Sequence, residues 1–247
     1  MRGKQRNTSE VIGIEFTTNE DYQVIVTNYI NARKVEVMFL DEHKFKMWTQ
    51  WDSLKNGSLK NPFHPSVNGV GYLGTDKNGQ IPNTTENGKL TREYRLWSNM
   101  LRRCYDEKYH EQYPTYKNCE VCERWKCYVY FLEDLPLIKN YEYWRDNPQQ
   151  RIALNKDIYY SDLGIITDCK EYSLLTTRFI SNKENIDDMI ERRIPQMAKR
   201  IRCIETQVIY DSIQQASRET GLDDGNIVKV CKGKAKTCGG LHWEYVD

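Results

Sequence analysis

Cysteine and histidine residues at short spacing between positions 104 and 127 could bind a metal ion. Cys119 and Cys122 are separated by two residues, which is the spacing of a zinc knuckle. Three further residues of this segment could complete a set of four ligands: Cys104, His110 and Cys127. A single Cys-x2-Cys pair without a second matching pair is equally typical of free thiols buried beneath helices. The sequence therefore leaves a zinc site and buried thiols as alternatives.

Lysine and asparagine side chains near the end of the sequence could bind nucleic acid. Residues 225–240 contain four lysines and no acidic residue, which gives this stretch a local charge of +4. Asparagine pairs with adenine edges, and lysine with guanine edges or phosphate oxygens. The residues that could make these contacts are Asn226, Lys229, Lys232, Lys234 and Lys236. The alternative is a solvated lysine loop.

Two short helices must position these side chains, and the first is predicted over residues 213–220. Ser212 can cap this helix, and Gln215 stands three residues further on, in the capping-box position. Gly221 ends the helix, because glycine adopts the left-handed conformation of a helix terminus. A strand over residues 207–210 is expected to precede it.

The second helix is predicted over about residues 225–232. Asp223 or Asp224 can cap it, and Gly233 ends it. Two helices joined by a tight glycine-containing turn are the framework of a helix-turn-helix unit, whose second helix enters the major groove. A strand over residues 242–245 is expected to follow.

An amphipathic helix is predicted over Arg92–Tyr105. Its apolar residues fall at helical spacing on one side: Tyr94, Trp97, Met100, Leu101 and Cys104. Its arginines lie mostly off that side: Arg92, Arg95, Arg102 and Arg103. They could contact phosphates or simply form a solvated surface.

The rest of the middle of the chain alternates between helix and strand patterns. The pattern predicts a helix over 127–135, a strand over 151–158, a turn over 161–164 and a strand over 172–176. A helix is expected from there to about residue 193, with Pro195 ending or kinking it.

The N-terminal residues have the pattern of a small β-sheet. Residues 22–29 and 34–40 alternate apolar and polar side chains, and the short connection between them predicts a β-hairpin. Residues 45–51 add strand material, and the Gly-, Asn- and Pro-rich residues 56–88 indicate loop and linker. Residues 1–67 are therefore expected to form a small twisted sheet or barrel.

Composition limits the class of protein. The chain has 247 residues and a formal net charge of +1, which argues against a uniformly basic histone-like protein. With 39% apolar and 12% aromatic residues it can bury a core. It has neither a membrane-spanning apolar stretch nor a secretory signal. We therefore expect an intracellular, cytoplasmic protein whose eight cysteines are reduced thiols or metal ligands.

The C-terminal stretch resembles the nuclease-associated modular DNA-binding domain found at the C-termini of phage and intron homing endonucleases. The matching residues are Tyr210–Ile213, Ala216, Gly221, Asn226–Ile227, Lys232–Lys234 and Gly240–Trp243. The resemblance implies double-stranded DNA as a partner. One departure is the acidic pair Asp223 and Asp224, where the family usually has Ser or Thr, and it places negative charge near the DNA.

The middle of the chain resembles, more loosely, phage HNH-endonuclease-like proteins. The matching residues are Tyr94, Trp97, Met100, Arg103–Cys104, Tyr113, Tyr116, Val121–Cys122, Trp125, Phe131, Leu154–Ile158, Thr176 and Asn182. Such proteins resemble the ββα-metal nuclease fold, in which a hairpin and a helix hold one divalent ion. A base activates water there, and Mg²⁺ stabilises the charge that develops on the phosphate.

The resemblance implies roles for individual residues. Asp157 and Asn182 would bind Mg²⁺, with Asn185 as a second option for the asparagine. Lys156 stands where a standard HNH nuclease has its histidine. A charged lysine is a poor general base unless its pKa is strongly lowered. His110 is the nearby histidine, about 45 residues upstream. Lys156, Arg102 and Arg103 would hold phosphates.

Together these patterns predict an α+β protein with a small β-rich N-terminal module, a degenerate HNH-like middle and a C-terminal helix-turn-helix module flanked by short strands. The predicted boundaries are 1–67, a linker over 68–91, 92–194, a second linker over 195–206, and 207–247.

The leading functional hypothesis is a divalent-metal-dependent homing-type endonuclease of a phage or mobile element that acts on double-stranded DNA. A DNA-binding regulator without catalytic activity is the alternative. A protein-binding adaptor or inhibitor is a third hypothesis, and it predicts binding with little salt dependence.

Overall fold

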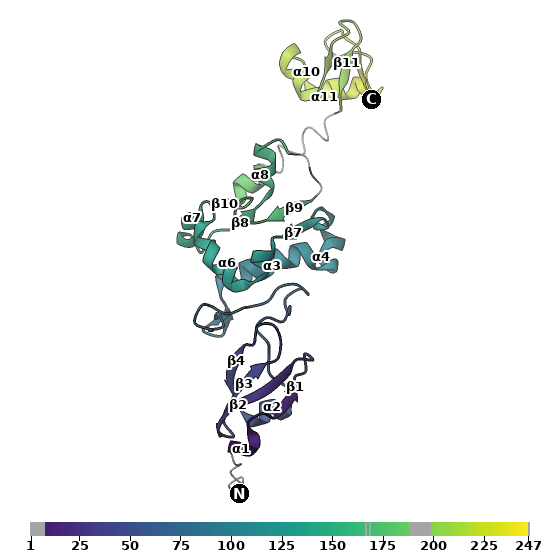
Figure 1. Cartoon of the computed structure of the whole chain (residues 1–247). Coiled ribbons are helices and arrows are strands. Elements are labelled where there is room, and N and C mark those ends of the chain that lie inside the picture. Colours follow the sequence, from purple (N-terminus) through teal and green to yellow (C-terminus); the bar gives the residue numbers. More distant parts are fainter. Residues whose placement is uncertain (1–7, 166, 168, 188–198, 247) are drawn as a thin grey trace. The chain divides into compact units, whose positions relative to one another are not determined.

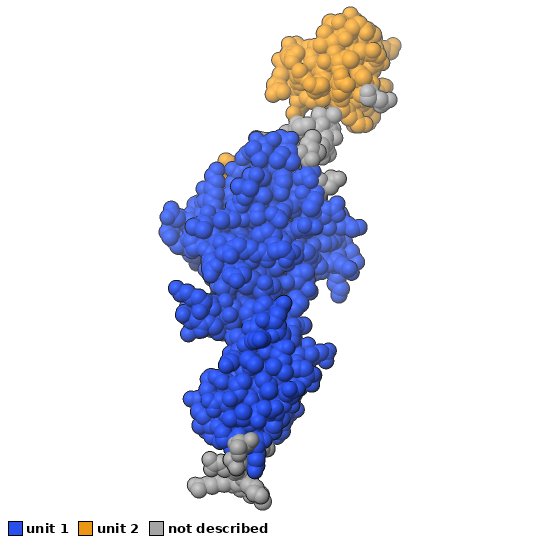
Figure 2. Space-filling view, viewed as in Figure 1, with its two compact units in different colours: residues 1–180 blue, residues 181–247 orange. Residues whose placement is uncertain are grey.

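The computed structural model describes residues 8–165, 167, 169–187 and 199–246, and it contains both helices and strands (Figure 1). The expected α+β class is therefore confirmed. The chain divides into two compact units, residues 1–180 and residues 181–247, which Figure 2 shows in different colours. The structural description below treats each unit by itself.

The first unit begins with a four-stranded antiparallel sheet. Its strands pair in sequence order: β1 (Glu15–Thr17), β2 (Gln23–Asn31), β3 (Lys34–Phe39) and β4 (Lys46–Thr49). The apolar positions of the alternating pattern face one core: Val24, Val26, Val35, Val37 and Phe39. Two short helices accompany the sheet, α1 (Thr8–Val11) and α2 (Trp51–Lys55). The predicted hairpin is confirmed, with a connection of only Ala32 and Arg33.

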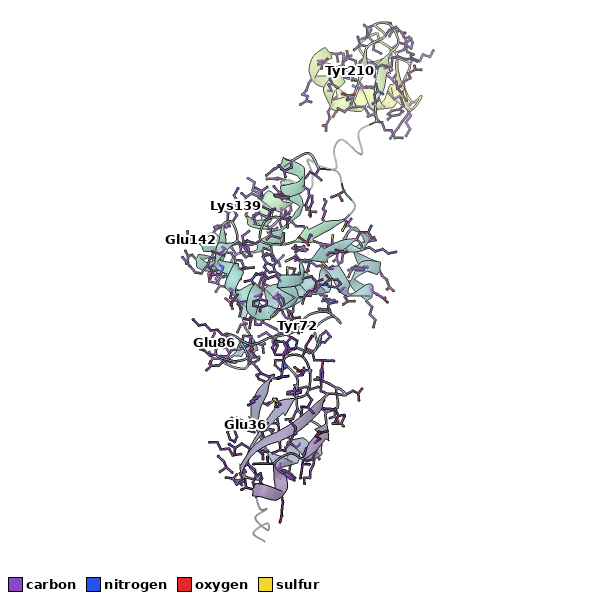
Figure 3. The ribbon with its side chains drawn as sticks, viewed as in Figure 1. Glu36, Tyr72, Glu86, Lys139, Glu142 and Tyr210 are labelled. Atoms are coloured by element: carbon purple, nitrogen blue, oxygen red, sulfur yellow. The ribbon has the colours of Figure 1, made fainter. Side chains whose placement is uncertain are left out.

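The segment that follows the sheet is packed against the middle of the chain, although its composition favours a linker. Tyr72, labelled in Figure 3, donates its backbone N–H to Lys126 O over 3.0 Å and accepts from Tyr128 N over 2.9 Å. A Cβ added to Gly71 would lie 2.3 Å from Leu101 Cδ1, so only glycine fits here without rearrangement. The prediction of a linker beginning at residue 68 is therefore wrong for residues 68–74. A small hairpin follows, formed by β5 (Thr85–Glu86) and β6 (Lys89–Leu90).

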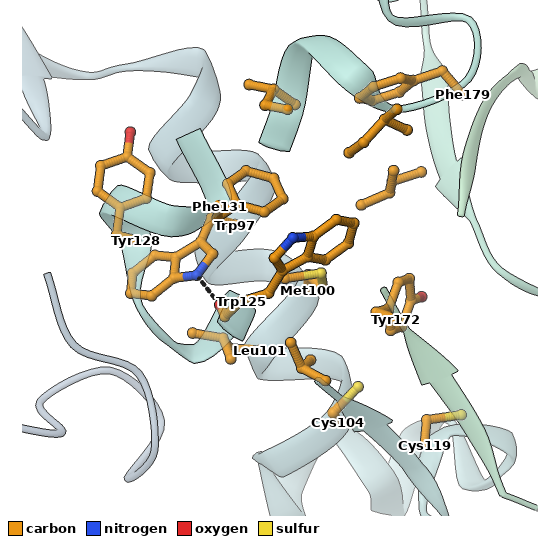
Figure 4. Close-up of a cluster of buried hydrophobic side chains, with 14 of the residues drawn as sticks. Trp97, Met100, Leu101, Cys104, Cys119, Trp125, Tyr128, Phe131, Tyr172 and Phe179 are labelled. Carbon is orange, nitrogen blue, oxygen red and sulfur yellow. Dashed lines mark hydrogen bonds between the residues drawn. The ribbon is translucent and has the colours of Figure 1, made fainter. Parts of the chain in front are cut away.

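Short helices build the core of the middle segment. They are α3 (Arg92–Tyr105), α4 (Glu107–Gln112), α5 (Glu123–Lys126), α6 (Tyr128–Asp134) and α7 (Tyr141–Asp146), with 3-10 turns at Pro114–Tyr116 and Leu135–Leu137. The predicted α3 is confirmed, and its apolar side is buried in a cluster of hydrophobic side chains, many of them aromatic (Figure 4). Trp97 Nε1 donates a hydrogen bond to Trp125 O over 2.7 Å inside this cluster.

Two pairs of strands complete the middle segment. β7 (Cys119–Val121) pairs in parallel with β9 (Lys170–Tyr172), and β8 (Ile152–Asn155) pairs with β10 (Arg178–Ser181). The helix α8 (Asp157–Asp162) follows β8, and a helical segment over residues 182–187 follows β10. Along the chain, the paired strands β8 and β10 are followed by the helical segment over residues 182–187. In sequence, α8 and β9 lie between the two paired strands.

Several predicted bounds in this region are wrong. The strand expected over 151–158 ends at Asn155, because its side-chain oxygen accepts a hydrogen bond from Ile158 N over 3.0 Å and the chain turns into α8. The strand expected over 172–176 ends at Tyr172, because Thr176 Oγ1 donates to Glu171 O over 2.6 Å and holds a turn. The expected end of the last helix and Pro195 lie outside the described residues.

The C-terminal unit contains a three-stranded sheet and two helices. β11 (Ile201–Cys203) is the central strand, and it pairs antiparallel with β12 (Ile209–Tyr210) and with β13 (Trp243–Tyr245). α10 (Ile213–Thr220) and α11 (Asp224–Cys231) cover a core of buried residues: Ile201, Cys203, Tyr210, Ala216, Ile227, Val230, Cys238 and Trp243. The linker predicted over 195–206 is therefore wrong at residues 201–203.

The strands at the edges of this sheet are shorter than the sequence pattern indicates. Gln207 has a φ of 57°, which is outside the extended region, so β12 cannot begin there. His242 precedes β13 and is held by Glu205, whose carboxylate accepts from His242 N over 2.8 Å and from the ring Nδ1 over 2.5 Å. These hydrogen bonds lower the pKa of the Glu205 carboxyl to about 2. His242 thus has a structural partner.

Candidate nucleic-acid interface

The first helix of the C-terminal pair, α10, is fixed by the predicted cap. Ser212 Oγ accepts a hydrogen bond from Gln215 N over 3.1 Å. Gln215 Oε1 accepts in return from Asp211 N over 2.8 Å, one residue before the position of an ideal capping box. Gly221 ends the helix with a φ of 72°. The sequence signals at both ends of this helix are confirmed.

The second helix, α11, is capped by Asp223 rather than Asp224. Asp223 Oδ1 accepts a hydrogen bond from Asn226 N over 2.8 Å, and Asp224 is the first helical residue. At the other end Gly233 has a φ of 68° and donates its N–H to Val230 O over 2.8 Å. Both alternatives for the cap were compatible with the sequence, and the hydrogen bond decides between them.

The turn between the two helices is held by side-chain contacts. Ser217 Oγ donates to Leu222 O over 2.6 Å. A Cβ on Gly239 would lie 2.4 Å from Leu222 Cδ2, so the loop after α11 packs closely on this turn. Ile227 is fully buried, as is Ala216 of α10. The angle between the helices is therefore set by packing.

All of the predicted DNA-binding residues of this unit are exposed: Asn226, Lys229, Lys232, Lys234 and Lys236. Lys229 O accepts from Lys234 N over 2.7 Å, which folds the loop back against the end of α11. The ion pairs described in this unit join Arg200 to Asp211, Arg202 to Glu244 and His242 to Glu205, and none of them involves the four lysines. The charges of these four lysines are thus available to an external anion.

Lys156, the residue in the position of the HNH histidine, is buried. Its side chain is 3% exposed, and its Nζ lies 5.2 Å from the ring centre of Tyr116 and 5.0 Å from that of Tyr172. Burial alone would lower the pKa of Lys156, but Tyr172, Asp157 and Cys119 outweigh it and raise the pKa above its ordinary value. An ammonium group that keeps its proton and lies inside the core cannot serve as a general base or reach a phosphate in this conformation. The sequence-based role for Lys156 is therefore not supported.

Asp157 is engaged by two ammonium groups. Its Oδ1 lies 3.3 Å from Lys156 Nζ and 3.0 Å from Lys170 Nζ. Lys170 comes from β9, and no spacing in the sequence signals its proximity to Asp157 because the contact depends on how the strands assemble. The carboxylate predicted to bind Mg²⁺ is thus neutralised by lysines of its own unit.

Asn182 opens the helical segment that follows β10. Ser181 and Glu184 form a capping box at its start: Ser181 Oγ accepts from Glu184 N over 3.1 Å, and Glu184 Oε2 accepts from Ser181 N over 2.7 Å. Asn182 belongs to the second compact unit and Asp157 to the first. Their joint role in binding Mg²⁺ stays a prediction.

His110 lies on α4, beside the end of α3. Its Nε2 is 2.9 Å from the backbone oxygen of Arg103. A carbonyl oxygen only accepts, so this ring nitrogen donates the hydrogen bond. The interaction gives His110 a local structural role.

The two arginines predicted to hold phosphates lie in different environments. Arg102 is exposed and already has two partners within the protein. Its Nε is 3.3 Å from Asp106 Oδ2, and its guanidinium lies 5.3 Å from the ring centre of Tyr109. Arg103 is half-buried, and its guanidinium lies 6.0 Å from the ring centre of Tyr116. Burial opposes its charged form, but the neighbouring Tyr172 and Tyr116 outweigh it and raise the pKa of Arg103.

The four cysteines of the zinc alternative are separate thiols. Cys119 Sγ contacts Thr115 O at 3.6 Å, and Cys127 Sγ contacts Leu73 O at 3.8 Å. Burial raises the pKa of Cys104 to about 12 and also raises the pKa values of Cys119, Cys122 and Cys127. Among the described residues no three His, Cys, Asp or Glu side chains form a group that could hold a metal ion. The structure therefore favours buried thiols over zinc.

Within the described part of the chain, the helices are all too short or too polar to cross a membrane.

Comparison with known proteins points to the same C-terminal unit. Residues 206–244 match the family described as "DNA endonuclease I-HmuI-like, NUMOD-like domain". An uncharacterized HNH endonuclease of Acanthamoeba polyphaga mimivirus is 47% identical over 38 residues, which are 15% of this chain and 12% of that protein. The chain is thus similar in part to HNH homing endonucleases, although it spans only a small share of the viral relative.

A solved structure was also found, described as "DNA binding and cleavage by the HNH homing endonuclease I-HmuI". The sequences are 18% identical, the match covers 38% of this chain and 58% of that one, and the TM-score is 0.20. A TM-score this low does not establish a shared fold.

Proposed function

We propose that this chain is a double-stranded-DNA-binding protein of the HNH homing-endonuclease type, in which α11 enters the major groove. The observation that carries the proposal is the exposed side of α11 and its loop, where Asn226 and four lysines face outward without a described ion pair. Asn226 and Lys229 would contact base edges. The lysines after the helix would contact phosphates: Lys232, Lys234 and Lys236.

The similarity of residues 206–244 to the NUMOD-like domain of I-HmuI-like DNA endonucleases supports this assignment, because it covers both helices and the lysine loop. The acidic residues at the start of α11 reduce the positive potential there. We infer that affinity depends on the loop lysines more than on the N-terminal end of the helix.

Hydrolysis of the DNA is a second candidate function, which the partial identity to a viral HNH endonuclease favours. HNH chemistry would require a divalent ion, Mg²⁺ in our proposal, but the arrangement described for Asp157 does not fit one. Its carboxylate is paired with Lys156 and Lys170, and the described residues provide no group of three ligands. Cleavage would thus require Asp157 to be released from these lysines. DNA binding without cleavage is the function that the geometry supports best.

One experiment separates these functions. The full chain is incubated with host and phage genomic DNA in Mg²⁺ or EDTA, and DNA ends are mapped while binding is measured by gel shift at several salt concentrations. A salt-sensitive shift with intact DNA supports the binding function. Discrete Mg²⁺-dependent ends would establish cleavage, and no shift in any salt would refute DNA binding.

The role of Asp157 is tested in the same assay with Asp157→Asn. If the chain cleaves DNA through Asp157, this variant loses cleavage and keeps the gel shift. Asp162→Asn is the matched control, because Asp162 lies on the same helix and its carboxylate pairs with Arg178 at the surface. Full cleavage by the Asp157→Asn variant would show that cleavage does not depend on Asp157.

A further inference from the structure

A groove lies between α3 and the strand β8 in the first unit. It encloses a cavity of about 270 Å³. Its lining includes Arg92, Arg95 and Arg103 of α3, Trp144 of α7, and Ile152 and Leu154 of β8. The helix supplies the polar side chains, and β8 supplies an apolar floor. The contacts proposed for α11 do not use this groove.

The groove is strongly cationic. Arg92, Arg95 and Arg103 follow one another on α3 at spacings of three and eight residues, which places them along one side of the helix. The lining contains no acidic residue, and no described carboxylate forms an ion pair with these three arginines. Arg102, by contrast, is paired with Asp106 and does not line the groove. Three guanidinium groups without a counterion indicate a site for an anion.

Two of the guanidinium groups are held in place by aromatic side chains. Arg92 stacks on the Trp144 ring at 3.8 Å, and Trp144 stacks on Phe179 of β10 at 5.1 Å with an interplanar angle of 17°. Burial lowers the pKa of Arg92, as expected for a desolvated cation. The guanidinium of Arg103 lies 6.0 Å from the ring centre of Tyr116. Because these arginines are ordered before any ligand arrives, binding an anion costs them less conformational entropy.

We propose that this groove binds one phosphodiester group of the DNA backbone, with Arg92, Arg95 and Arg103 around the phosphate oxygens. The planar guanidinium fork matches two phosphate oxygens at once, and the apolar floor of β8 suits the sugar beside them. The proposal rests on the proposed DNA-binding function and adds a second contact surface to it. The groove positions the duplex without reading its sequence. Since β8 leads directly into Asn155–Asp157, the bound backbone lies next to the HNH-like segment.

The test measures DNA affinity of the full chain as a function of salt for Arg95→Gln, Arg92→Gln/Arg95→Gln and Arg102→Gln. Each substitution removes charge from the same helix, and only Arg102 lies outside the groove. Arg95 is exposed, so its variant should fold normally, and thermal melting verifies this for all three. We expect the double variant to reduce the slope of log K against log salt by roughly 0.9, the value for one lost phosphate contact on duplex DNA. Arg102→Gln should leave the slope unchanged, because Arg102 is paired with Asp106 outside the groove and we therefore withdraw the phosphate contact that the resemblance implied for it.

The outcomes distinguish the groove from the proposed function. If the wild-type chain bound DNA and the slope were unchanged in both groove variants, the phosphate contact in the groove would be refuted. The proposed DNA binding would still stand. An equal loss in Arg102→Gln would also refute the contact in the groove, because the effect would then reflect the charge of the helix as a whole. If the wild-type chain bound no DNA, the proposed function and the groove assignment would both fail.

Discussion

Lys229 Nζ donates a hydrogen bond to Asn226 Oδ1 over 3.0 Å on the exposed side of α11. The two side chains are three residues apart and both are exposed, while Ile227 and Val230 of the same helix are buried in the core. In a complex with DNA, base edges would replace this hydrogen bond. In the proposed complex the pair would thus present one donor group and one amide to the same stretch of the major groove.

Replacing both residues with alanine should relax site preference. Each lost base contact removes about 1–3 kcal/mol of discrimination, so preferred and random duplexes should converge in affinity. Binding assays with a selected site and a scrambled site measure this difference. Arg218→Ala is the control: it removes an exposed charge from α10 and should weaken binding to both duplexes alike. An equal loss on both duplexes for Asn226→Ala/Lys229→Ala would contradict α11 as the recognition helix.

Substitutions of the two aspartates at the start of α11 should differ in their effect on stability and agree in their effect on DNA affinity. Asp223→Ala removes the cap and should cost about 1 kcal/mol in the free energy of unfolding, measured by urea denaturation. Asp224→Ala leaves the cap in place and should lose only a few tenths of a kcal/mol. Both remove negative charge near the DNA, so both should bind more tightly at low salt. If Asp224→Ala bound no better than the wild type, the start of α11 would lie away from the phosphates.

Asp157 and Lys156 should couple energetically. Asp157→Asn leaves a buried ammonium without its nearest carboxylate and should destabilise the chain by about 1–3 kcal/mol. Lys156→Met is of similar volume, and replacing a buried charge by an apolar side chain is often close to neutral. Combining the two substitutions should recover much of the loss, measured by thermal or urea unfolding. Simple additivity would show that the pair contributes no interaction energy.

Thiol reactivity should follow burial. Cys169 is exposed and should react promptly with a thiol reagent at pH 8, whereas Cys104, Cys119 and Cys127 should react only as the protein unfolds. Burial holds the pKa of Cys104 near 12, so its thiolate form is scarce at that pH. Mass spectrometry of the labelled peptides identifies the reacted residues, and Cys169→Ser should remove the prompt phase. A chelator that lowered the melting temperature and exposed new thiols would instead revive the zinc alternative.

The elements that the sequence predicts best are those with local signals at both ends. The bounds of α3 follow from its apolar periodicity, and Thr91 caps it by accepting from Tyr94 N over 3.1 Å. The caps of α10 and α11 are equally local, because Ser212 and Asp223 bond residues only three positions away. Such contacts depend on spacing along the chain and on little else.

The features that the sequence does not predict depend on contacts between distant segments. β11 is only three residues long, and its strand character comes from pairing with β12 and β13 on both sides. Lysine side chains are usually exposed. The burial of Lys156 results from contacts with Tyr172 and Tyr116, which lie far from it in sequence. The groove likewise requires Trp144 to meet Arg92. Hydrophobic pattern alone gives no signal for any of these.

The central position of β11 decides where the C-terminal unit can be cut or exchanged. The family similarity starts at residue 206, but the strand that joins β12 to β13 lies before it, at Ile201–Cys203. A fragment or chimera that began at residue 206 would leave both outer strands without their shared neighbour and would open the core beneath Trp243. A transplantable unit must therefore start upstream of Ile201. The natural junction for domain shuffling in this chain would accordingly lie before the stretch that carries the recognisable similarity.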